Sequence, residues 1–434
     1  MTSPSSLSPP LRGADVLIIG AGVMGYGLAW RLSQSGRRVV LLDRGSPGGE
    51  ASYAAAGILA AQIEARESPA LLSLALASRA LYPGWAEALR EQTGLDIGLR
   101  RCGVLMLASA DPAVAEADLQ AQAALLSQQR ALDLPVEALS PAAVRGIEPG
   151  LAPVAGALRF AEDGQVEPPR LLAALTAAAQ AQGVRLLRGE VQGITLASFP
   201  GRDHSVSFLP EAGEPASLLH APELVLCAGS WSASIAGTPL PAHSVFPVRG
   251  QMVELFAAPS PLSHVCFGHV PSRLAAASRK PGLSEPAEAG HGYLVPRGDG
   301  RVVIGSTTER VGFVKAVTTA GLLDLLTLAE SLVPALGAAT VTHTWAGLRP
   351  GSADELPLIG PLTGPLTGPV IGRGEPTPPP SVWVCSGHYR NGILLAPASV
   401  EALAAQICRQ SPPSPLAAVP WPAFSPGRYS NCEK

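Results

Sequence analysis

Three glycines and one acidic residue near the N-terminus have the spacing of a dinucleotide-binding turn. Gly20, Gly22 and Gly25 form the pattern GxGxxG, and Asp43 ends the next apolar run. In such a turn the first glycine allows a tight bend, the second lets the backbone approach a pyrophosphate, and the third lets a helix pack closely on a strand. An acid placed like Asp43 can accept hydrogen bonds from a ribose. The four residues therefore predict a dinucleotide site.

The residues around this turn read as one βαβ unit that would hold it in place. Residues 14–44 divide into an apolar strand, the glycine turn, a helix and a second apolar strand. The helix has an apolar stripe for packing on a sheet, and it presents unpaired N–H groups and its positive dipole end to the turn. The unit predicts a dinucleotide site, but it does not distinguish FAD from NAD.

The next segment, GSPGGEASYAAAGIL at residues 45–59, is rich in small residues. Such a segment would let a backbone run close to a flat, extended ligand. A small-residue turn that enters a helix explains the same composition equally well. These residues alone therefore leave the choice of cofactor open.

The composition is that of a globular protein with few surface charges. Hydrophobic residues make up 47% of the 434 residues, charged residues make up 15%, and the formal net charge is -3. The length predicts two or three domains, and nothing recommends nucleic acid or an anionic membrane as a partner. The apolar stretches stop short of the roughly 20 residues of a bilayer span, which predicts no transmembrane segment. The scattered cysteines and histidines predict no metal site and favour a reducing, cytoplasmic setting.

Three longer motifs identify a family. GGEASYAAAGILA, AGLRPGSADELPLIG and GHYRNGILLAP resemble the glycine oxidases of the thiamine pathway, within the D-amino-acid oxidase and sarcosine oxidase family. The resemblance runs from Asp15 to about Ile407 in the same order and with compatible spacing. It implies FAD as the cofactor. AGLRPGSADELPLIG contains no cysteine, which argues against the covalent flavin link of monomeric sarcosine oxidases and favours non-covalent binding.

The resemblance also assigns residues to the cofactor. Asp43 stands where the family more often has Glu, and the shorter acid can still reach the ribose. Val191 corresponds to a residue that packs near the adenine, and the segment from His388 to Leu394 to one whose backbone lies against the flavin. The implied FAD contacts are Gly20, Gly22, Val23, Met24, Gly25, Asp43, Arg44, Ala51, Ser52, Ala56, Gly57, Ile58, Val191, His388, Tyr389, Arg390, Asn391, Gly392, Ile393 and Leu394.

The activity implied is the oxidation of a small amino acid at its C–N bond. Glycine, with sarcosine or small D-amino acids as further substrates, is oxidised to an imine that hydrolyses to glyoxylate and ammonia, and O2 is reduced to hydrogen peroxide. Such an enzyme must fix the substrate carboxylate, and the planar guanidinium of arginine suits this task. Arg349 corresponds to the carboxylate-binding arginine of the family, Tyr293 to a tyrosine that assists it, and Arg390 to a second active-site arginine. Judged without the resemblance, Arg349 could equally be a surface arginine before a Pro–Gly turn.

Several alternatives share these motifs. A sarcosine or D-amino-acid oxidase, a dehydrogenase that uses another electron acceptor, and a glycine-oxidising subunit of a cyanide-forming complex all remain open. An NAD-binding protein or a catalytically silent flavoprotein would belong to a different class. The resemblance implies a homotetramer and a role in making the thiazole of thiamine.

The predicted fold class is α/β, or α+β overall, with a Rossmann-like FAD-binding domain and a substrate domain built on an antiparallel sheet. Apolar and β-branched runs with turns between them predict this sheet within residues 245–307. Two insertions rich in proline and glycine, at 271–290 and 361–380, are interpreted as a mobile loop and a surface linker. The expected division assigns residues 13–90, 160–240 and 341–410 to the FAD domain, 91–159 and 241–340 to the substrate domain, and 1–12 and 411–434 to flexible termini.

Overall fold

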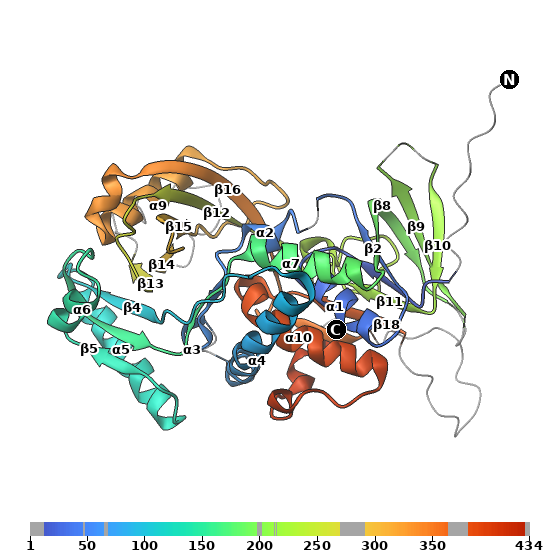
Figure 1. Ribbon diagram of the computed structural model, residues 1–434, viewed down its shortest axis with the longest axis horizontal. Coiled ribbons are helices and arrows are strands. Elements are labelled where there is room, and N and C mark those ends of the chain that lie inside the picture. Colours follow the sequence, from blue (N-terminus) through green and yellow to red (C-terminus); the bar gives the residue numbers. More distant parts are fainter. Residues whose placement is uncertain are drawn as a thin grey trace.

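Two eight-stranded sheets with helices packed on them form the body of the protein (Figure 1). The computed structural model describes residues 13–46, 48–64, 68–197, 202–211, 213, 215–269, 291–362 and 381–429. The insertion predicted at 271–290, and all but the first two residues of the one at 361–380, lie outside these ranges. The predicted fold class, a mixed α/β protein with a Rossmann-like unit, is confirmed.

The first sheet has a parallel centre, as an alternation of apolar strands and helices predicts. Strand β1 pairs in parallel with β2 and β11, and β18 continues this arrangement beside β11. Antiparallel strands complete both edges. In spatial order the strands are β10 (Ser217–Ala221), β9 (His204–Pro210), β8 (Arg185–Thr195), β2 (Val39–Asp43), β1 (Val16–Ile19), β11 (Glu223–Leu226), β18 (Val382–Ser386) and β17 (Leu358–Pro361).

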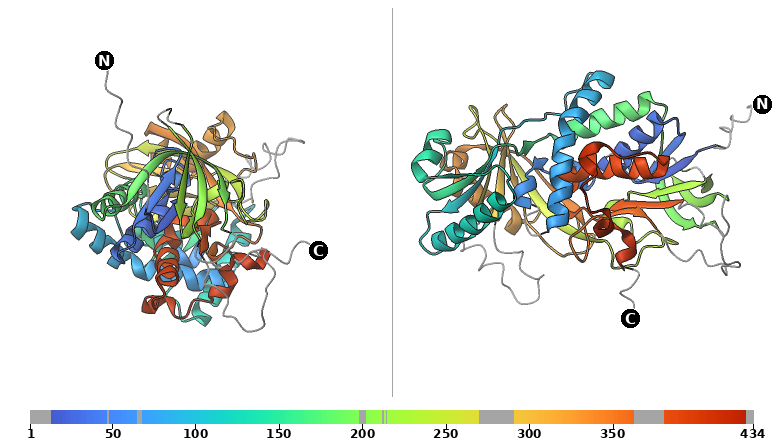
Figure 2. Two further views of the ribbon diagram at one scale, coloured as in Figure 1. Left: turned by 90° about the vertical axis from the view of Figure 1, so that its right-hand side faces the viewer. Right: turned by 90° about the horizontal axis from the view of Figure 1, so that it is seen from below.

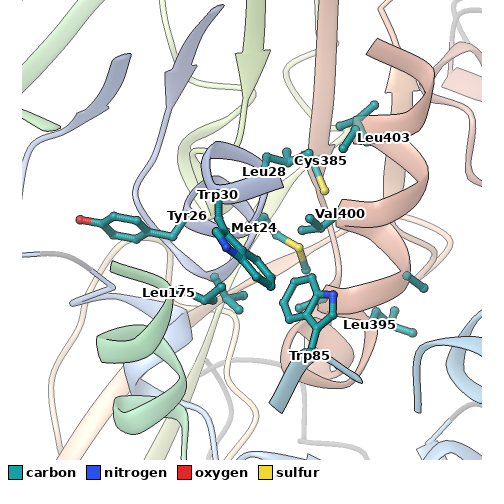
Figure 3. Close-up of a cluster of buried hydrophobic side chains, with 14 of the residues drawn as sticks. Met24, Tyr26, Leu28, Trp30, Trp85, Leu175, Cys385, Leu395, Val400 and Leu403 are labelled. Atoms are coloured by element: carbon teal, nitrogen blue, oxygen red, sulfur yellow. The ribbon is translucent and has the colours of Figure 1, made fainter. Parts of the chain in front are cut away.

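Four helices bury a large apolar core beside this sheet. Trp30 and Trp85 meet edge to face there, with ring centroids 5.4 Å apart, and Met24 and Val400 are buried in the same cluster (Figure 3). Residues from both ends of the chain share this core because the first and last of these helices are neighbours. The helices are α1 (Val23–Gln34), α4 (Pro69–Thr93), α7 (Pro168–Ala181) and α10 (Gly392–Cys408).

One segment, Tyr389–Cys408, is long and apolar enough to cross a membrane by length and composition. Within the protein, 83% of its most apolar window is buried. A helix that packs on α1 and α4 in this way has the apolar surface of a core helix, and its hydrophobicity is accounted for by that packing.

The second sheet is antiparallel except where β13 and β4 pair in parallel. Its two longest strands, β12 and β16, pair from Phe246 opposite Gly351 to Phe256 opposite Thr340. Helix α9 (Thr319–Leu332) contacts β12, β14 and β15, while α5 (Ala115–Ala131) contacts β4 and β6, with α6 (Pro141–Ile147) also against β6. In spatial order the strands are β16 (Thr340–Gly351), β12 (Phe246–Phe256), β15 (Arg301–Gly305), β14 (His291–Pro296), β13 (Val265–His269), β4 (Val104–Ser109), β6 (Val154–Phe160) and β5 (Glu137–Leu139).

The expected start of the third FAD-domain segment at residue 341 is wrong. Residues 340–351 form β16, the edge strand of the second sheet, so the chain returns to the first sheet only at β17. Figure 1 shows β16 beside β12 and α9, away from β11, β18 and α10, and the right-hand view of Figure 2 shows the red helix α10 beside the blue helices α1 and α4. The rest of the proposed division into two domains stays a prediction.

The expected flexible C-terminal tail is also wrong for residues 411–429. Three short 3-10 helices follow α10, and Leu416, Phe424 and Tyr429 from them are buried. The hydroxyl of Tyr429 donates to Asp354 at 2.7 Å. Apolar contacts and hydrogen bonds thus fix this segment, while residues 1–12 and 430–434 lie outside the described ranges. The segments are η4 (Ser414–Leu416), η5 (Trp421–Phe424) and η6 (Pro426–Tyr429).

Short elements join the two sheets. Helix α2 (Ala51–Ala54) packs on β16, where the Trp345 indole donates to the Ala54 carbonyl at 3.0 Å. A Cβ added at Gly347 would lie 2.4 Å from that of Ala54, so this glycine lets the helix and the strand approach closely. The other short elements are β3 (Ile58–Leu59), α3 (Ala61–Glu64), β7 (Gly164–Gln165), η1 (Gly229–Trp231), η2 (Pro334–Ala338) and η3 (Tyr389–Asn391).

Candidate active site

The turn between β1 and α1 accepts only glycine at two positions, Gly20 and Gly25. Gly20 has a φ of +106°, and a Cβ there would lie 2.3 Å from the Cys227 carbonyl oxygen on the strand beside it. A Cβ at Gly25 would lie 1.8 Å from the Gly20 carbonyl oxygen. At Gly22 the one atom near such a Cβ is the Ser52 hydroxyl, at 3.0 Å. The turn is therefore tightly packed on the protein side and open to close approach at Gly22, which fits a pyrophosphate.

Asp43 ties this turn to the end of β2. Its carboxylate accepts from the Ala21 N–H at 2.6 Å through Oδ2 and from the Gly45 N–H at 2.8 Å through Oδ1. A carboxylate has further lone pairs, so Asp43 can accept from ribose hydroxyls while it holds the turn. Asp43 can thus hold the glycine turn and bind a ribose at the same time.

The segment after β2 is fastened to the turn and to the second sheet. Ser52 accepts from the Val23 N–H at 3.0 Å, which occupies one N-terminal donor of α1. Gly57 has a φ of +77°, and a Cβ there would lie 2.1 Å from the Val166 carbonyl oxygen. Ala51, Ser52, Ala56, Gly57 and Ile58, all predicted FAD contacts, therefore lie on one constrained stretch of backbone that crosses between the sheets.

Arg297 fixes this stretch and was not singled out from the sequence. Its buried guanidinium donates to the Ala56 carbonyl at 2.6 Å, to the Val166 carbonyl at 3.1 Å and to Gln165 at 2.7 Å. Burial lowers the pKa of Arg297 to about 10, which leaves it charged at neutral pH. No local sequence pattern indicates this role, because the partners of Arg297, two carbonyls and the Gln165 side chain, lie more than 100 residues away in the sequence.

Arg349 lies on β16 with its guanidinium over β12. The guanidinium donates to the carbonyls of Thr307 at 3.1 Å and Arg249 at 3.4 Å, and to the Ser306 hydroxyl at 2.5 Å. A Cβ at Gly250 would lie 2.2 to 2.4 Å from three guanidinium atoms, so the absence of a side chain at Gly250 makes room for this placement. The groups that accept hydrogen bonds from the Arg349 guanidinium are therefore all neutral.

The charge of Arg349 has no protein counter-ion among the described residues, since its hydrogen-bond partners there are two carbonyls and a hydroxyl. Burial lowers its pKa, the neighbouring Tyr293 raises it, and the charge of Arg390 lowers it further. A guanidinium carries five N–H donors, of which three are engaged, leaving donors on Nε and Nη2. The side chain nevertheless keeps part of its surface accessible. An enclosed cation with donors on Nε and Nη2 beyond this set, close to Tyr293, is suited to a carboxylate.

Tyr293 and Arg390 lie near Arg349, as the resemblance implied. The Tyr293 ring lies over Gly305, where a Cβ would be 2.5 Å from it, and its hydroxyl is 3.5 Å from the Met252 sulfur. Arg390 donates to the Thr308 hydroxyl at 3.2 Å. Thr307 and Thr308 are consecutive, so the loop after β15 brings the two arginines together from β16 and η3.

The segment around Arg390 leads into α10. His388 is buried, its Nε2 lies 3.0 Å from the Ser399 hydroxyl, and burial lowers its pKa to about 3, so it is neutral at pH 7. The hydroxyl of Tyr82 donates to the Ile393 carbonyl. Because α10 begins at Gly392, its N-terminal N–H groups and positive dipole end lie beside the two arginines.

The remaining predicted contacts fall into two groups. The side chains of Val23, Met24, Ala56, Ile393 and Leu394 are almost fully buried, so these residues can offer a cofactor chiefly their main-chain atoms. Val191 is half-buried on β8, past the point where Arg188 pairs with Asp43. Arg44 is exposed, and its guanidinium lies 4.0 Å from the centre of the Trp231 ring. Trp231 lies in η1, which follows β11.

The comparisons with known proteins agree with this geometry. A family model described as DAO, FAD dependent oxidoreductase, matches residues 15–406. This chain belongs to that family. The members are FAD-dependent oxidoreductases, so the prediction of FAD over NAD is confirmed.

Within the FAD dependent oxidoreductases the chain is similar to proteins named for glycine oxidation. It is 34% identical to "Glycine oxidase" of Geobacillus kaustophilus (strain HTA426), over 88% of this chain and 90% of that one. It is also 34% identical to "Bifunctional protein ThiO/ThiG" of Synechocystis sp., covering 96% of this chain but 54% of that protein. The crystal structure of glycine oxidase from Geobacillus kaustophilus matches with a TM-score of 0.77 and 32% identity, over 95% of this chain and 97% of that chain. The predicted resemblance to glycine oxidases is confirmed.

Proposed function

We propose that this protein is a glycine oxidase, which uses FAD and O2 to convert glycine to glyoxylate, ammonia and hydrogen peroxide. The observation that carries the proposal is Arg349, an enclosed cation with free donors and no acidic partner among the described residues. The similarity to proteins named glycine oxidase supports the same substrate. Non-covalently bound FAD would supply the electron acceptor for the C–N bond.

The residues of the chain would bind and orient the amino acid. Arg349 would donate two parallel hydrogen bonds to the carboxylate, and the Tyr293 hydroxyl would donate a third. Arg390 would add positive charge at the edge of the site. With the carboxylate fixed, the Cα–H bond has few orientations left, and such orientation can remove several kcal/mol from a barrier. Among the described residues no acidic side chain pairs with Arg349, so none there would compete with the substrate.

The FAD contacts would divide between two regions. Gly20, Gly22, Gly25 and the start of α1 would hold the pyrophosphate, and Asp43 the adenosine ribose. The stretch Ala51–Ile58 and the segment His388–Leu394 would lie along the flavin, where the N-terminus of α10 would favour negative charge. Arg44 and Val191 would border the adenosine. These assignments rest on the family resemblance and on the geometry of the glycine turn.

We further infer a homotetramer in the cytoplasm that serves thiamine thiazole synthesis, on the basis of the resemblance and the ThiO/ThiG relative. Sarcosine and small D-amino acids would be secondary substrates. A dehydrogenase that does not use O2, and a subunit of a cyanide-forming complex, are the competing assignments. Both would oxidise glycine without releasing hydrogen peroxide.

Purified protein tests the proposal directly. We expect the visible absorption of oxidised flavin, its bleaching by glycine without air, and its return with release of peroxide when air is admitted. Peroxide release should be compared for glycine, sarcosine, D-alanine and D-proline. Colourless protein that binds NAD would refute the proposal. Bleaching by glycine without peroxide release would favour the dehydrogenase assignments.

A further inference from the structure

A network of polar side chains, buried at Arg249 and Gln251 and half-buried at Thr307 and Glu309, adjoins the backbone that binds Arg349 and has no role in the proposed function. Its centre is Glu309, in the loop between β15 and α9. One carboxylate oxygen pairs with the Arg249 guanidinium, and the other accepts from the Gln251 amide at 2.7 Å and the Thr307 hydroxyl at 2.6 Å. Polar side chains that are hydrogen-bonded to one another restrict the arrangements of the backbone that carries them.

The network controls the backbone that touches Arg349. Residues 249 and 309 exchange two main-chain hydrogen bonds, of 2.8 and 3.0 Å, so the loop is paired with β12. The two carbonyls that accept from Arg349 belong to Arg249 and Thr307, and the side chains of both residues bind Glu309. Glu309 therefore holds in register the two carbonyls that orient the guanidinium.

The network also gives two nearby cations, Arg249 and Arg349, different electrostatic surroundings. Arg249 is 5% exposed and pairs with Glu309, whereas Arg349 has no acidic partner among the described residues. Burial alone would raise the pKa of Glu309, but its bonds to Arg249, Thr307 and Gln251 outweigh burial and lower the pKa, so the carboxylate is ionised at neutral pH. Its negative charge is directed to Arg249, which leaves Arg349 free for an external anion.

We propose that Glu309 is a positioning residue for Arg349, the carboxylate-binding residue that we call the clamp. By joining Arg249, Gln251 and Thr307, Glu309 sets the orientation of Arg349 toward the carboxylate of the amino acid. This proposal rests on the assignment of Arg349 as the clamp in the proposed function. It makes Glu309 a determinant of carboxylate affinity without contact with the substrate.

The sign of the effect separates positioning from electrostatics. Removing a negative charge near Arg349 makes the site more positive, and electrostatics alone would then tighten the binding of an anion. If Glu309 acts by position, its removal weakens binding despite the more favourable charge. Glu309→Gln, which removes the charge but keeps an acceptor for Thr307 and Gln251, should retain most of the affinity.

The test uses acetate, which keeps the carboxylate of glycine and lacks its amine, with its Kd read from the flavin spectrum of the holoenzyme. For Glu309→Ala we expect an acetate Kd and a glycine KM raised about tenfold or more, with kcat within about threefold, as the loss of bonds to a charged group implies. For Glu309→Gln both constants should stay within about threefold of the parent. The control is Glu148→Ala, a more deeply buried carboxylate that accepts three hydrogen bonds, from Ser263 and His264, and whose partners do not include Arg349.

An unchanged or tighter acetate Kd in Glu309→Ala, or an equal rise in Glu148→Ala, would overturn the proposal. If Glu309→Ala does not fold, Thr307→Val decides: an acetate Kd raised about threefold or more supports the proposal, and an unchanged Kd overturns it. A parent enzyme whose flavin glycine does not reduce would instead refute the proposed function. Acetate binding would still report on Glu309 in that case.

Discussion

Replacing Arg349 by alanine tests the carboxylate clamp most directly. The change removes the guanidinium that lies over Gly250 and leaves the carbonyls of Thr307 and Arg249 without that donor. FAD binding should survive, because the glycine turn and Asp43 lie on the other sheet. The expected loss therefore falls on glycine and not on the cofactor.

The size of the loss follows from the donors that remain for substrate. Two N–H groups of Arg349 are free for a carboxylate, and breaking such a buried charge pair costs about 2–5 kcal/mol. At about 1.4 kcal/mol for each factor of ten, kcat/KM for glycine should fall by roughly 30-fold to 4,000-fold. Arg349→Lys keeps the charge but loses the planar fork, so its loss should lie between those of the parent and the alanine variant.

The assay is the rate of flavin bleaching by glycine without air, measured over a range of glycine concentrations. Flavin content and thermal unfolding of each variant serve as controls for folding and cofactor binding. If Arg349→Ala retains FAD and its kcat/KM lies within about threefold of the parent, Arg349 is not the clamp, since even one lost charge-assisted bond should exceed that factor. Equal losses in the lysine and alanine variants would show that substrate binding depends on the planar guanidinium of Arg349 and not on its positive charge.

Three further predictions concern the cofactor and stability. Asp43→Ala loses the bonds to the Ala21 and Gly45 N–H groups, so we expect FAD affinity to fall about tenfold or more in a titration of apoprotein, whereas Asp15→Ala, which removes an exposed partner of Arg38, should leave it unchanged. Arg297→Met leaves buried carbonyls of Ala56 and Val166 without their donor, and the free energy of unfolding should fall by about 3 kcal/mol in denaturant titrations; a change under about 0.5 kcal/mol would contradict this. Burial lowers the pKa of His388 to about 3, so below pH 6.5 the unfolded chain binds a proton at this residue whereas the folded chain does not. The free energy of unfolding should therefore fall with decreasing pH by up to about 1.4 kcal/mol per pH unit, and His388→Gln should lessen this slope.

The cofactor half of the protein could be predicted from local sequence. Gly20, Gly22, Gly25 and Asp43 lie within one βαβ unit, where each residue acts on its neighbours in the chain and the spacing alone fixes the geometry. The start of α7 at Pro168 and the end of α4 at Gly94 are set locally in the same way, since a proline at a helix start and a left-handed glycine at a helix end act on adjacent residues. The choice of FAD needed longer motifs, because the unit itself serves either dinucleotide.

The substrate half depended on contacts that no local pattern encodes. A single sequence shows Arg349 only as an arginine before a Pro–Gly turn, yet the pairing of β16 with β12 places it over Gly250, about a hundred residues away, and moves it from the expected FAD domain to the second sheet. Ser306, Thr307 and Glu309 carried no motif, because their role comes from a loop that pairs with β12.

The C-terminal tail gives the same lesson. A flexible end is expected at residues 411–434, but Phe424 and Tyr429 occupy buried positions that exist only once the first sheet is formed. Sequence by itself therefore determined the dinucleotide turn, since that turn is built from neighbours in the chain. The position and surroundings of Arg349 were decided by the tertiary structure, because strand register and the burial of charge depend on residues far apart in the sequence.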